Sequence, residues 1–325
     1  MYLFLIFISL ILLLYIFFVK DKRTEKIFNN FNLQLTTSKK SKNLHQSMNN
    51  SNLYKNKLKV SQLMQMVNNN QIYINATKCF NDDPEKDLCF YKYLSPKKVV
   101  GKELKLIGPK HDGGYALLND FENIRIAYSI GIDGEISFDR ELANKNIDVY
   151  MYDHTINALY FENPKFHWKK IGISGISNKS KNTKTLEEML AENGHLNEIN
   201  MILKMDVERA EWNALLDISE DILKKFKYIT IEFHFGNETE KYFQVFKKLY
   251  KTHQVIYLVC NNYRDRIVFL KNNVICGYIE ISYVIREGNQ FYSDNTTYPI
   301  LEIKDKNYQK PVHPYNLNIL KLFDD

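Results

Sequence analysis

The 325-residue sequence has no surplus of positive charge outside its first quarter. Its formal net charge of +6 arises because residues 1–78 carry eleven Lys or Arg against Asp21 and Glu25. The remaining residues contain 33 basic and 36 acidic side chains, which gives a net charge of −3. A domain that binds nucleic acid usually presents a basic face, so we expect no nucleic-acid partner.

Cysteine is also scarce, with four residues in the whole chain. Cys79 and Cys89 flank a short polar loop that could close as a small disulfide ring. Cys260 and Cys276 flank a predicted pair of strands. Four cysteines permit three pairings, and the sequence does not choose among them.

The N-terminus lacks charged residues up to Lys20, and Tyr2 to Val19 is apolar apart from Ser9. At a rise of about 1.5 Å per residue, a helix of this length spans roughly 27 Å, close to the thickness of a thin bilayer. The segment also lacks the basic region and the small-residue cleavage site that mark a cleaved signal peptide. Residues 1–20 are therefore predicted to form a transmembrane signal-anchor.

The orientation of this predicted span is less clear. Basic residues follow it, and the positive-inside rule would keep the rest of the chain in the cytosol. The cysteines and the N-x-[ST] sequons favour a lumenal domain in the secretory pathway, in the Golgi or the ER, although about three sequons are expected by chance in so Asn-rich a chain. The sequons lie at Asn49, Asn75, Asn178, Asn237 and Asn295. We expect the lumenal orientation and leave the cytosolic one open.

Residues 21–96 are predicted to be a polar basic stem that is partly disordered. Most of this segment is rich in Asn, Lys, Ser and Gln, and such a composition buries too little apolar surface to offset chain entropy. The folded domain is predicted to span residues 97–325.

Within this domain, short apolar runs alternate with helical patterns, which predicts an α/β domain with a mainly parallel sheet. Two short strands, KELKLI and YALL, surround the Gly-rich turn GPKHDGG. The later predicted strands are 124–130, 147–152, 166–173, 199–205 and 228–235, followed by QVIYLVC and YIEISYVIR. The last two strands have no long helix between them, which predicts an antiparallel edge. Ligands bind beyond the carboxyl ends of such strands, so functional residues are expected there.

The turn after strand 124–130 is the first such place. It lacks the third glycine of G-x-G-x-x-G, so it is not a dinucleotide fingerprint. Gly131 permits a tight turn, and Gly134 lets a ligand approach the backbone at a helix N-terminus. Asp153 ends the next strand about 20 residues later, where an acidic side chain can accept hydrogen bonds from ribose hydroxyls. The alternatives are an ordinary strand–helix turn and a solvent-facing Asp that caps the following turn.

Two further strand ends carry charged side chains. Lys204, Asp206 and Glu208 alternate along one strand end and are predicted to share a face, and Glu232 and His234 do the same on the next. Charges at inward positions of buried strands are costly unless they are paired or functional. This group could bind a divalent cation, position a hydroxyl, or form a closed salt-bridge network with Lys204.

Taken in order, several segments within residues 98–287 resemble the FkbM-type and METTL24-like methyltransferases, which use S-adenosylmethionine. These segments are DGGYALL, AYSIGIDGEISFDREL, VYMYD, TLEEML, LKMDVERAEW and TIEFH. The resemblance implies a class I methyltransferase fold, which is Rossmann-like and has a seven-stranded, mostly parallel sheet with an antiparallel last strand. Animal members are often membrane-anchored in the secretory pathway, which agrees with a lumenal domain. The family usually has Gly after the D-x-E pair, where this chain has Arg209.

The resemblance also implies roles for individual residues. The cofactor-binding residues would be Gly131, Asp133, Gly134, Asp153, Asp112, Gly113 and Tyr115. The catalytic residues would be Asp206, Glu208, Glu232 and His234. His234 would act as a base, or Asp206, Glu232 and His234 would hold a divalent cation that acidifies the acceptor.

These expectations describe a membrane-anchored, S-adenosylmethionine-dependent O-methyltransferase that acts on a hydroxyl of a small molecule or a glycan. One alternative is a non-catalytic, methyltransferase-like membrane-anchored module that keeps the fold. Another is a nucleotide-sugar-dependent transferase, because that class also combines an anchor, a stem and an α/β domain.

Overall fold

The computed structural model describes residues 90–261, 267–270 and 273–293. The predicted span at 1–20 and most of the predicted stem at 21–96 lie outside these residues, as do the side chains of all four cysteines. Within the described ranges, no helix is both long and apolar enough to cross a membrane. The anchor and the disulfides therefore stay predictions.

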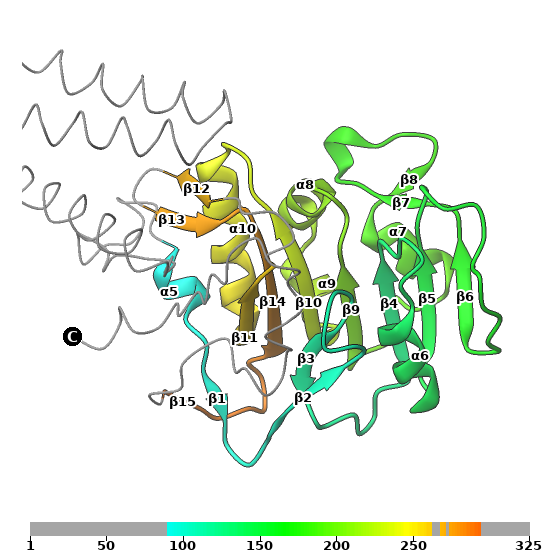
Figure 1. Ribbon diagram of the computed structural model, residues 1–325, viewed down its shortest axis with the longest axis horizontal. Helices are drawn as coiled ribbons and strands as arrows, with labels where there is room; N and C mark the ends of the chain where they lie inside the picture. Colours follow the sequence, from blue (N-terminus) through cyan, green and yellow to red (C-terminus); the bar gives the residue numbers. More distant parts are fainter. Residues whose placement is uncertain (1–89, 262–266, 271–272, 294–325) are drawn as a thin grey trace, which may run out of the picture. The chain divides into compact units, whose positions relative to one another are not determined.

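A seven-stranded sheet forms the centre of the described fold (Figure 1). In spatial order its strands are β11 (His253–Cys260), β14 (Tyr278–Ile285), β10 (Phe226–His234), β9 (Met201–Met205), β4 (Ile126–Ile130), β5 (Asp148–Tyr152) and β6 (Phe166–Lys169). The five strands from β10 to β6 are parallel, whereas β14 runs antiparallel to both β10 and β11. The predicted mixed α/β fold with an antiparallel last strand in a seven-stranded sheet is confirmed.

The predicted antiparallel edge is wrong in one respect, because β14 lies inside the sheet and β11 forms the edge. The crossover helix α10 (Thr239–Thr252) connects β10 to β11. A helix is about 10 Å across, whereas neighbouring strands are about 4.8 Å apart, so strands joined by a helix fit well two positions apart. The hairpin of β12 (Ile267–Leu270) and β13 (Asn273–Cys276) then precedes β14, which fills the gap.

The alternation of side chains along the strands divides the core into two layers. One layer packs against α7 (Leu186–Glu192), α8 (Ala210–Asp217), α9 (Glu220–Leu223) and α10. The opposite layer packs against α6 (Ser137–Asn144) and the hairpin of β2 (Leu104–Ile107) and β3 (Tyr115–Leu118). Lys204, Glu232 and His234 occupy alternate positions to the residues of the first layer, so they lie on the hairpin side of the sheet.

Short elements complete the described fold. β1 (Lys98–Val99) pairs with β15 (Phe291–Tyr292), and β7 (Gly172–Ile173) pairs with β8 (Thr183–Lys184). A short 3-10 helix, η2 (Ile176–Asn178), follows β7. The single strand predicted at 166–173 is therefore two strands, β6 and β7, which belong to different sheets.

The packed part of the chain extends before the predicted boundary at residue 97. Phe90, which precedes the short helix α5 (Tyr91–Leu94), and Tyr93, which lies within it, are buried against α10. Their rings meet Phe246 and Phe243 edge to face, with ring centroids 5.3 Å apart in each pair. These aromatic residues follow a long polar segment, which is why the sequence pattern assigned them to the stem.

Candidate active site

The glycine turn after β4 brings two strand ends into close contact. Gly131 has a φ of +79°, and a Cβ atom there would lie 1.6 Å from the carbonyl oxygen of Asp206. The Gly131 amide donates to the Tyr152 carbonyl at 2.9 Å, and the Asp206 amide donates to the Ile130 carbonyl at 2.9 Å. Only glycine fits here, because both the backbone angle and the close approach exclude a side chain.

Asp153 is buried and holds this turn in place. One carboxylate oxygen accepts from the amides of Ile132 and Asp133 at 2.8 and 3.1 Å. The other accepts from the amide and hydroxyl of Thr155 at 2.7 and 2.6 Å. Burial alone would raise the pKa of Asp153, but these hydrogen bonds lower it to about 2. All four acceptor positions of the carboxylate are used, so a ribose hydroxyl would have to replace one of these donors.

The end of β9 contacts the β2–β3 hairpin through Tyr115. The Lys204 ammonium donates to the Gly131 carbonyl and lies 5.8 Å from the centre of the Tyr115 ring. The Tyr115 hydroxyl lies 3.4 Å from Oδ2 of Asp206. The hairpin therefore lies over these two charged positions at the end of β9.

The backbone leaves the strand conformation after Met205, so the predicted alternation does not continue to Glu208. Glu208 and Arg209 have φ values of +48° and +88°. The Glu208 side chain is 85% exposed, yet its Oε2 still lies 3.7 Å from Nε2 of His234. A left-handed turn, and not strand periodicity, directs this carboxylate toward the histidine.

His234 is buried at the end of β10, and carboxylates surround its ring. Nε2 lies 3.7 Å from Asp206, 3.7 Å from Glu208 and 3.8 Å from Glu232. Nδ1 lies 3.3 Å from Oε1 of Glu211, on the opposite side of the ring. Burial alone would lower the pKa of His234, but the hydrogen bond with Glu211 and the surrounding negative charges raise it.

A second group of carboxylates surrounds Glu232. Glu232 and Glu280 are direct cross-strand neighbours on β10 and β14, and both are buried. Oxygens of Asp112, Glu232 and Glu280 all lie within 4.8 Å of one another. Asn261 Nδ2 donates to Glu232 Oε1 at 3.1 Å. Burial, and then the charges of Asp206, Glu280 and Asp112, raise the pKa of Glu232 well above its ordinary value.

The structure thus brings the predicted catalytic residues together, and it adds three that the sequence did not single out. The additional residues are Glu211, Asn261 and Glu280. Glu280 carried a signal, because it is the one charged residue within the apolar strand YIEISYVI. Glu211 did not, since an acidic residue in the first turn of a helix is common on exposed surfaces.

The predicted cofactor-binding residues lie beside this cluster. Gly131 lies against the backbone carbonyl of Asp206, which belongs to the cluster. Asp133 and Gly134 lie further along the same turn, and the Asp133 amide donates to Asp153. Gly113 forms the bend of the hairpin with a φ of +81°.

Burial raises the pKa of Asp206, while the positive charges of Lys204 and His234 lower it.

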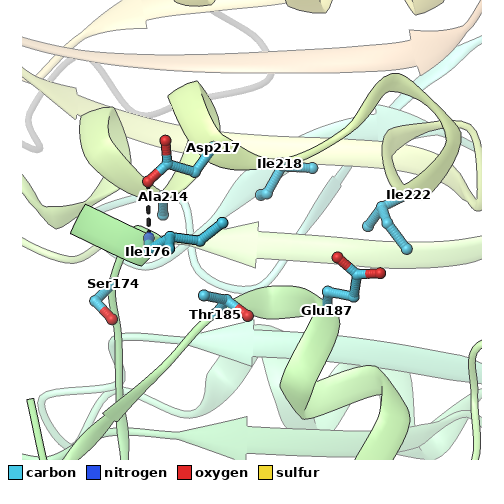
Figure 2. A pocket seen from close by; sticks show the side chains of 8 residues that line it. All are labelled: Ser174, Ile176, Thr185, Glu187, Ala214, Asp217, Ile218 and Ile222. Carbon is cyan, nitrogen blue, oxygen red and sulfur yellow. Dashed lines mark hydrogen bonds between the residues drawn. The ribbon is translucent and has the colours of Figure 1, made fainter. Parts of the chain in front are cut away.

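Two cavities lie elsewhere in the described part of the chain. One, of about 20 Å³, has room for about one water molecule. It is lined by Ser174, Ile176, Thr185, Glu187, Ala214, Asp217, Ile218 and Ile222, and Figure 2 shows Asp217 accepting from the Ile176 amide, at 2.7 Å. The other, of about 380 Å³, lies between the β2–β3 turn and α6, the helix that follows the glycine turn. The linings of these two cavities include neither Asp206 nor His234.

The sheet and the site define a class of protein. A seven-stranded α/β sheet with one inserted antiparallel strand, a glycine turn after β4 and acidic strand ends agrees with the fold that the class I methyltransferase resemblance implies. Residues 117–266 match the model of the methyltransferase FkbM domain. The matched segment includes Gly131, Asp206 and His234, whereas Asp112 and Glu280 lie outside it. The match does not distinguish the METTL24-like subtype.

Two further comparisons add little. No curated protein matches the sequence significantly. Among solved structures, the chain is similar to a candidate rRNA-methylase from Clostridium thermocellum. The sequence identity is 13% and the TM-score is 0.29, and the match covers 50% of this chain and 86% of the other. A likeness of this size carries no argument about substrate.

Proposed function

We propose that residues 97–325 act as an S-adenosylmethionine-dependent O-methyltransferase whose acceptor is a hydroxyl of a small molecule or a glycan. The observation that carries the proposal is the position of His234, whose Nε2 faces Asp206, Glu208 and Glu232 at the carboxyl edge of the sheet. A hydroxyl is a poor nucleophile, and an imidazole that accepts its proton can activate it. The FkbM domain match supports methyl transfer as the reaction.

The residues around the glycine turn fit the proposed cofactor in charge and in shape. Gly131 and Gly134 leave backbone without side chains at the strand end, and the hairpin residue Tyr115 lies across the site. The carboxylates of Asp206 and Glu232 favour a positively charged ligand. When bound, S-adenosylmethionine supplies a methyl group from its sulfonium to the acceptor oxygen and leaves as a neutral thioether. Asp153 supports the turn and would reach a ribose hydroxyl by releasing a bond from Thr155.

The protein's own part in the reaction is to hold and move one proton. Nε2 of His234 takes the proton of the acceptor hydroxyl as that oxygen becomes bonded to the methyl carbon. The positive imidazolium that results lies beside Asp206, Glu208 and Glu211, and their negative charges stabilise it. The raised pKa of His234 has the same physical cause.

A divalent cation is the alternative means of activating the hydroxyl. Asp206, Glu232 and His234 are its candidate ligands, and Asp112 and Glu280 place two more carboxylates near Glu232. Removal of divalent cations with a chelator separates the two mechanisms. Activity that persists after chelation assigns the activation to His234 alone.

We also propose that the protein is anchored by residues 1–20, with residues 21–96 as a stem and the domain in the lumen of the Golgi or the ER. The long apolar run and the family resemblance support this location. Sensitivity of the full-length protein to glycosidase would support the lumenal orientation, and a fully unglycosylated product would favour the cytosolic one.

The first prediction tests the role of His234. We expect His234→Ala and His234→Asn to lower methyl transfer by about 10²-fold or more, because neither retains Nε2 as a proton acceptor. Asn can still donate a hydrogen bond to Glu211, so it keeps the structural contact. Isothermal titration should show S-adenosylhomocysteine binding close to that of the unchanged protein. His167→Ala, at the edge strand β6, is the control and should keep full activity.

The same titrations separate the competing functions. Binding of a nucleotide sugar without either sulfur nucleoside would overturn the proposal in favour of a sugar transferase. Binding of S-adenosylmethionine without turnover on a broad panel of hydroxyl acceptors would favour the non-catalytic module. Full turnover by both His234 variants would show that this histidine is not the base.

A further inference from the structure

Glu211 is a buried carboxylate on a helix, at a position where acidic side chains are commonly exposed. It is the second residue of α8 and is 0% exposed. Its Oε1 accepts from the backbone amide of His234 at 2.7 Å and lies 3.3 Å from Nδ1 of the same residue. Its Oε2 is buried and has no hydrogen-bond partner among the residues that the structure describes. An ionised group at such a depth is costly unless its contacts compensate for the lost water.

The position at the start of a helix accounts for only part of this arrangement. A carboxylate in the first turn is stabilised by the helix dipole, as Glu187 is in α7. Glu187, however, is exposed, whereas Glu211 points into the protein and makes both of its contacts with one residue. The indole of Trp212 fixes the same residue from the other direction, because Nε1 donates to the His234 carbonyl at 2.8 Å.

We propose that Glu211 is a positioning residue that holds the proton of His234 on Nδ1. A carboxylate can only accept, so Nδ1 must be the donor, and Nε2 is then left without a proton when the ring is neutral. Nε2 is the atom that faces Asp206, Glu208 and Glu232. Glu211 therefore presents the histidine in the tautomer that can take a proton from a hydroxyl.

The proposal rests on the function proposed for His234, but its structural part can be tested independently. Nitrogen-15 spectra of the full-length protein labelled at histidine report which ring nitrogen carries the proton, at a pH where the ring is neutral. We expect Nδ1 of His234 to carry it. A proton on Nε2 in the unchanged protein would overturn the proposal without any variant.

Glu211→Gln is the matching variant. Both contacts use Oε1, so the amide oxygen of Gln can take that position and keep the contact with the His234 backbone amide. It is neutral and therefore a weaker acceptor for the Nδ1 proton, and it does not stabilise the imidazolium, so a larger share of the neutral rings should carry the proton on Nε2. We expect kcat to fall by about 10²-fold or more, with the KM for S-adenosylmethionine changed less than about twofold, since only the proton acceptor is lost. The exposed Glu187→Gln is the control and should keep both constants.

The possible outcomes are distinct. An unchanged kcat and an unchanged tautomer in Glu211→Gln would reduce Glu211 to a structural role and overturn the proposal. The expected tautomers in a protein without methyl transfer would support Glu211 as the positioning residue and leave the proposed function as the part that failed. A loss of S-adenosylmethionine affinity with kcat unchanged would also contradict the proposal, because it would place Glu211 in cofactor binding.

Discussion

Two consecutive residues without the freedom of glycine adopt left-handed backbone conformations after β9. Glu208 has a φ of +48° and Arg209 a φ of +88°. Arg209 is also the residue that precedes the first turn of α8, and its side chain makes no capping hydrogen bond there. The FkbM-type pattern that the sequence resembles usually has Gly at this position, and glycine adopts a positive φ without strain. The turn at Glu208 and Arg209, which directs the Glu208 carboxylate toward His234, is therefore strained in this chain.

This strain leads to a prediction at Arg209. We expect Arg209→Gly to raise the free energy of unfolding by about 1 kcal/mol, because the relief of a left-handed conformation exceeds the entropy that glycine adds to the unfolded chain. Denaturant unfolding of the full-length protein measures the change. Arg209→Ala is the control, since it removes the charge but keeps the strain, and it should give no gain. Equal stability of both variants would show that the positive φ costs nothing.

At this scale the sequence predicted which residues carry charge at the strand ends, but not how they face one another. Asp206 and His234 were found because charged residues are conspicuous at the ends of apolar runs. Glu211 reaches His234 only because the left-handed turn at Glu208 and Arg209 redirects the chain into α8. For Asp153 the sequence left two roles open, a ribose acceptor and a cap of the following turn, and its bonds with Thr155 are the capping contact, although the side chain is buried and does not face solvent.

Among the elements, β4 and β9 are neighbouring parallel strands whose ends meet at the site. The Gly131 turn allows this approach, because a Cβ atom there would overlap the Asp206 carbonyl at 1.6 Å. The overlap is with backbone, so no side-chain rearrangement can relieve it. The distance between the two strand ends also sets where Asp206 lies relative to Tyr115 and His234.

Gly131→Ala should therefore destabilise the protein by more than about 3 kcal/mol or prevent folding. Gly194→Ala is the matched control, since Gly194 also has a positive φ, of +75°, but open space where its Cβ would lie. It should cost only about 1 kcal/mol, the cost of the backbone conformation alone. Thermal unfolding of the two variants gives the comparison. If both lost the same stability, the contact with Asp206 would not be what requires glycine.

The existence of most elements was predictable, whereas their order in space was not. Strands such as β4, β5 and β10 follow from short apolar runs between polar helical segments. The insertion of β14 between β10 and β11 depends on pairing between residues far apart in the sequence, such as Glu232 with Glu280. That pairing decides which carboxylates meet, so the site could be predicted only in part.

At the scale of the whole molecule, His253 joins three parts of the fold. It ends α10 and begins β11, and it is 0% exposed. Its Nε2 lies 2.9 Å from the carbonyl of Phe226 at the start of β10, and its Nδ1 lies 2.8 Å from the hydroxyl of Thr252. Burial lowers the pKa of His253 to about 4; the contact with Phe226 raises it and the charge of Arg286 lowers it.

This lowered pKa makes the fold sensitive to acid. In the unfolded chain His253 has an ordinary pKa near 6.5, so below that pH the unfolded state binds a proton that the folded state excludes down to about pH 4. The free energy of unfolding should fall across this window, by about 3 kcal/mol from this residue alone. Other buried groups also titrate, such as Asp153 with its pKa of about 2, so a variant is needed to isolate the effect.

His253→Gln provides that variant, because its amide can still donate to the Phe226 carbonyl but does not titrate. Between pH 7 and pH 4, the stability of the unchanged protein should fall more steeply than that of His253→Gln, and the two curves should become parallel below pH 4. Denaturant unfolding at a series of pH values measures both curves. His154→Gln, at an exposed histidine, should leave the steep fall in place. Parallel curves for the unchanged protein and His253→Gln throughout this range would mean that another group makes the fold sensitive to acid.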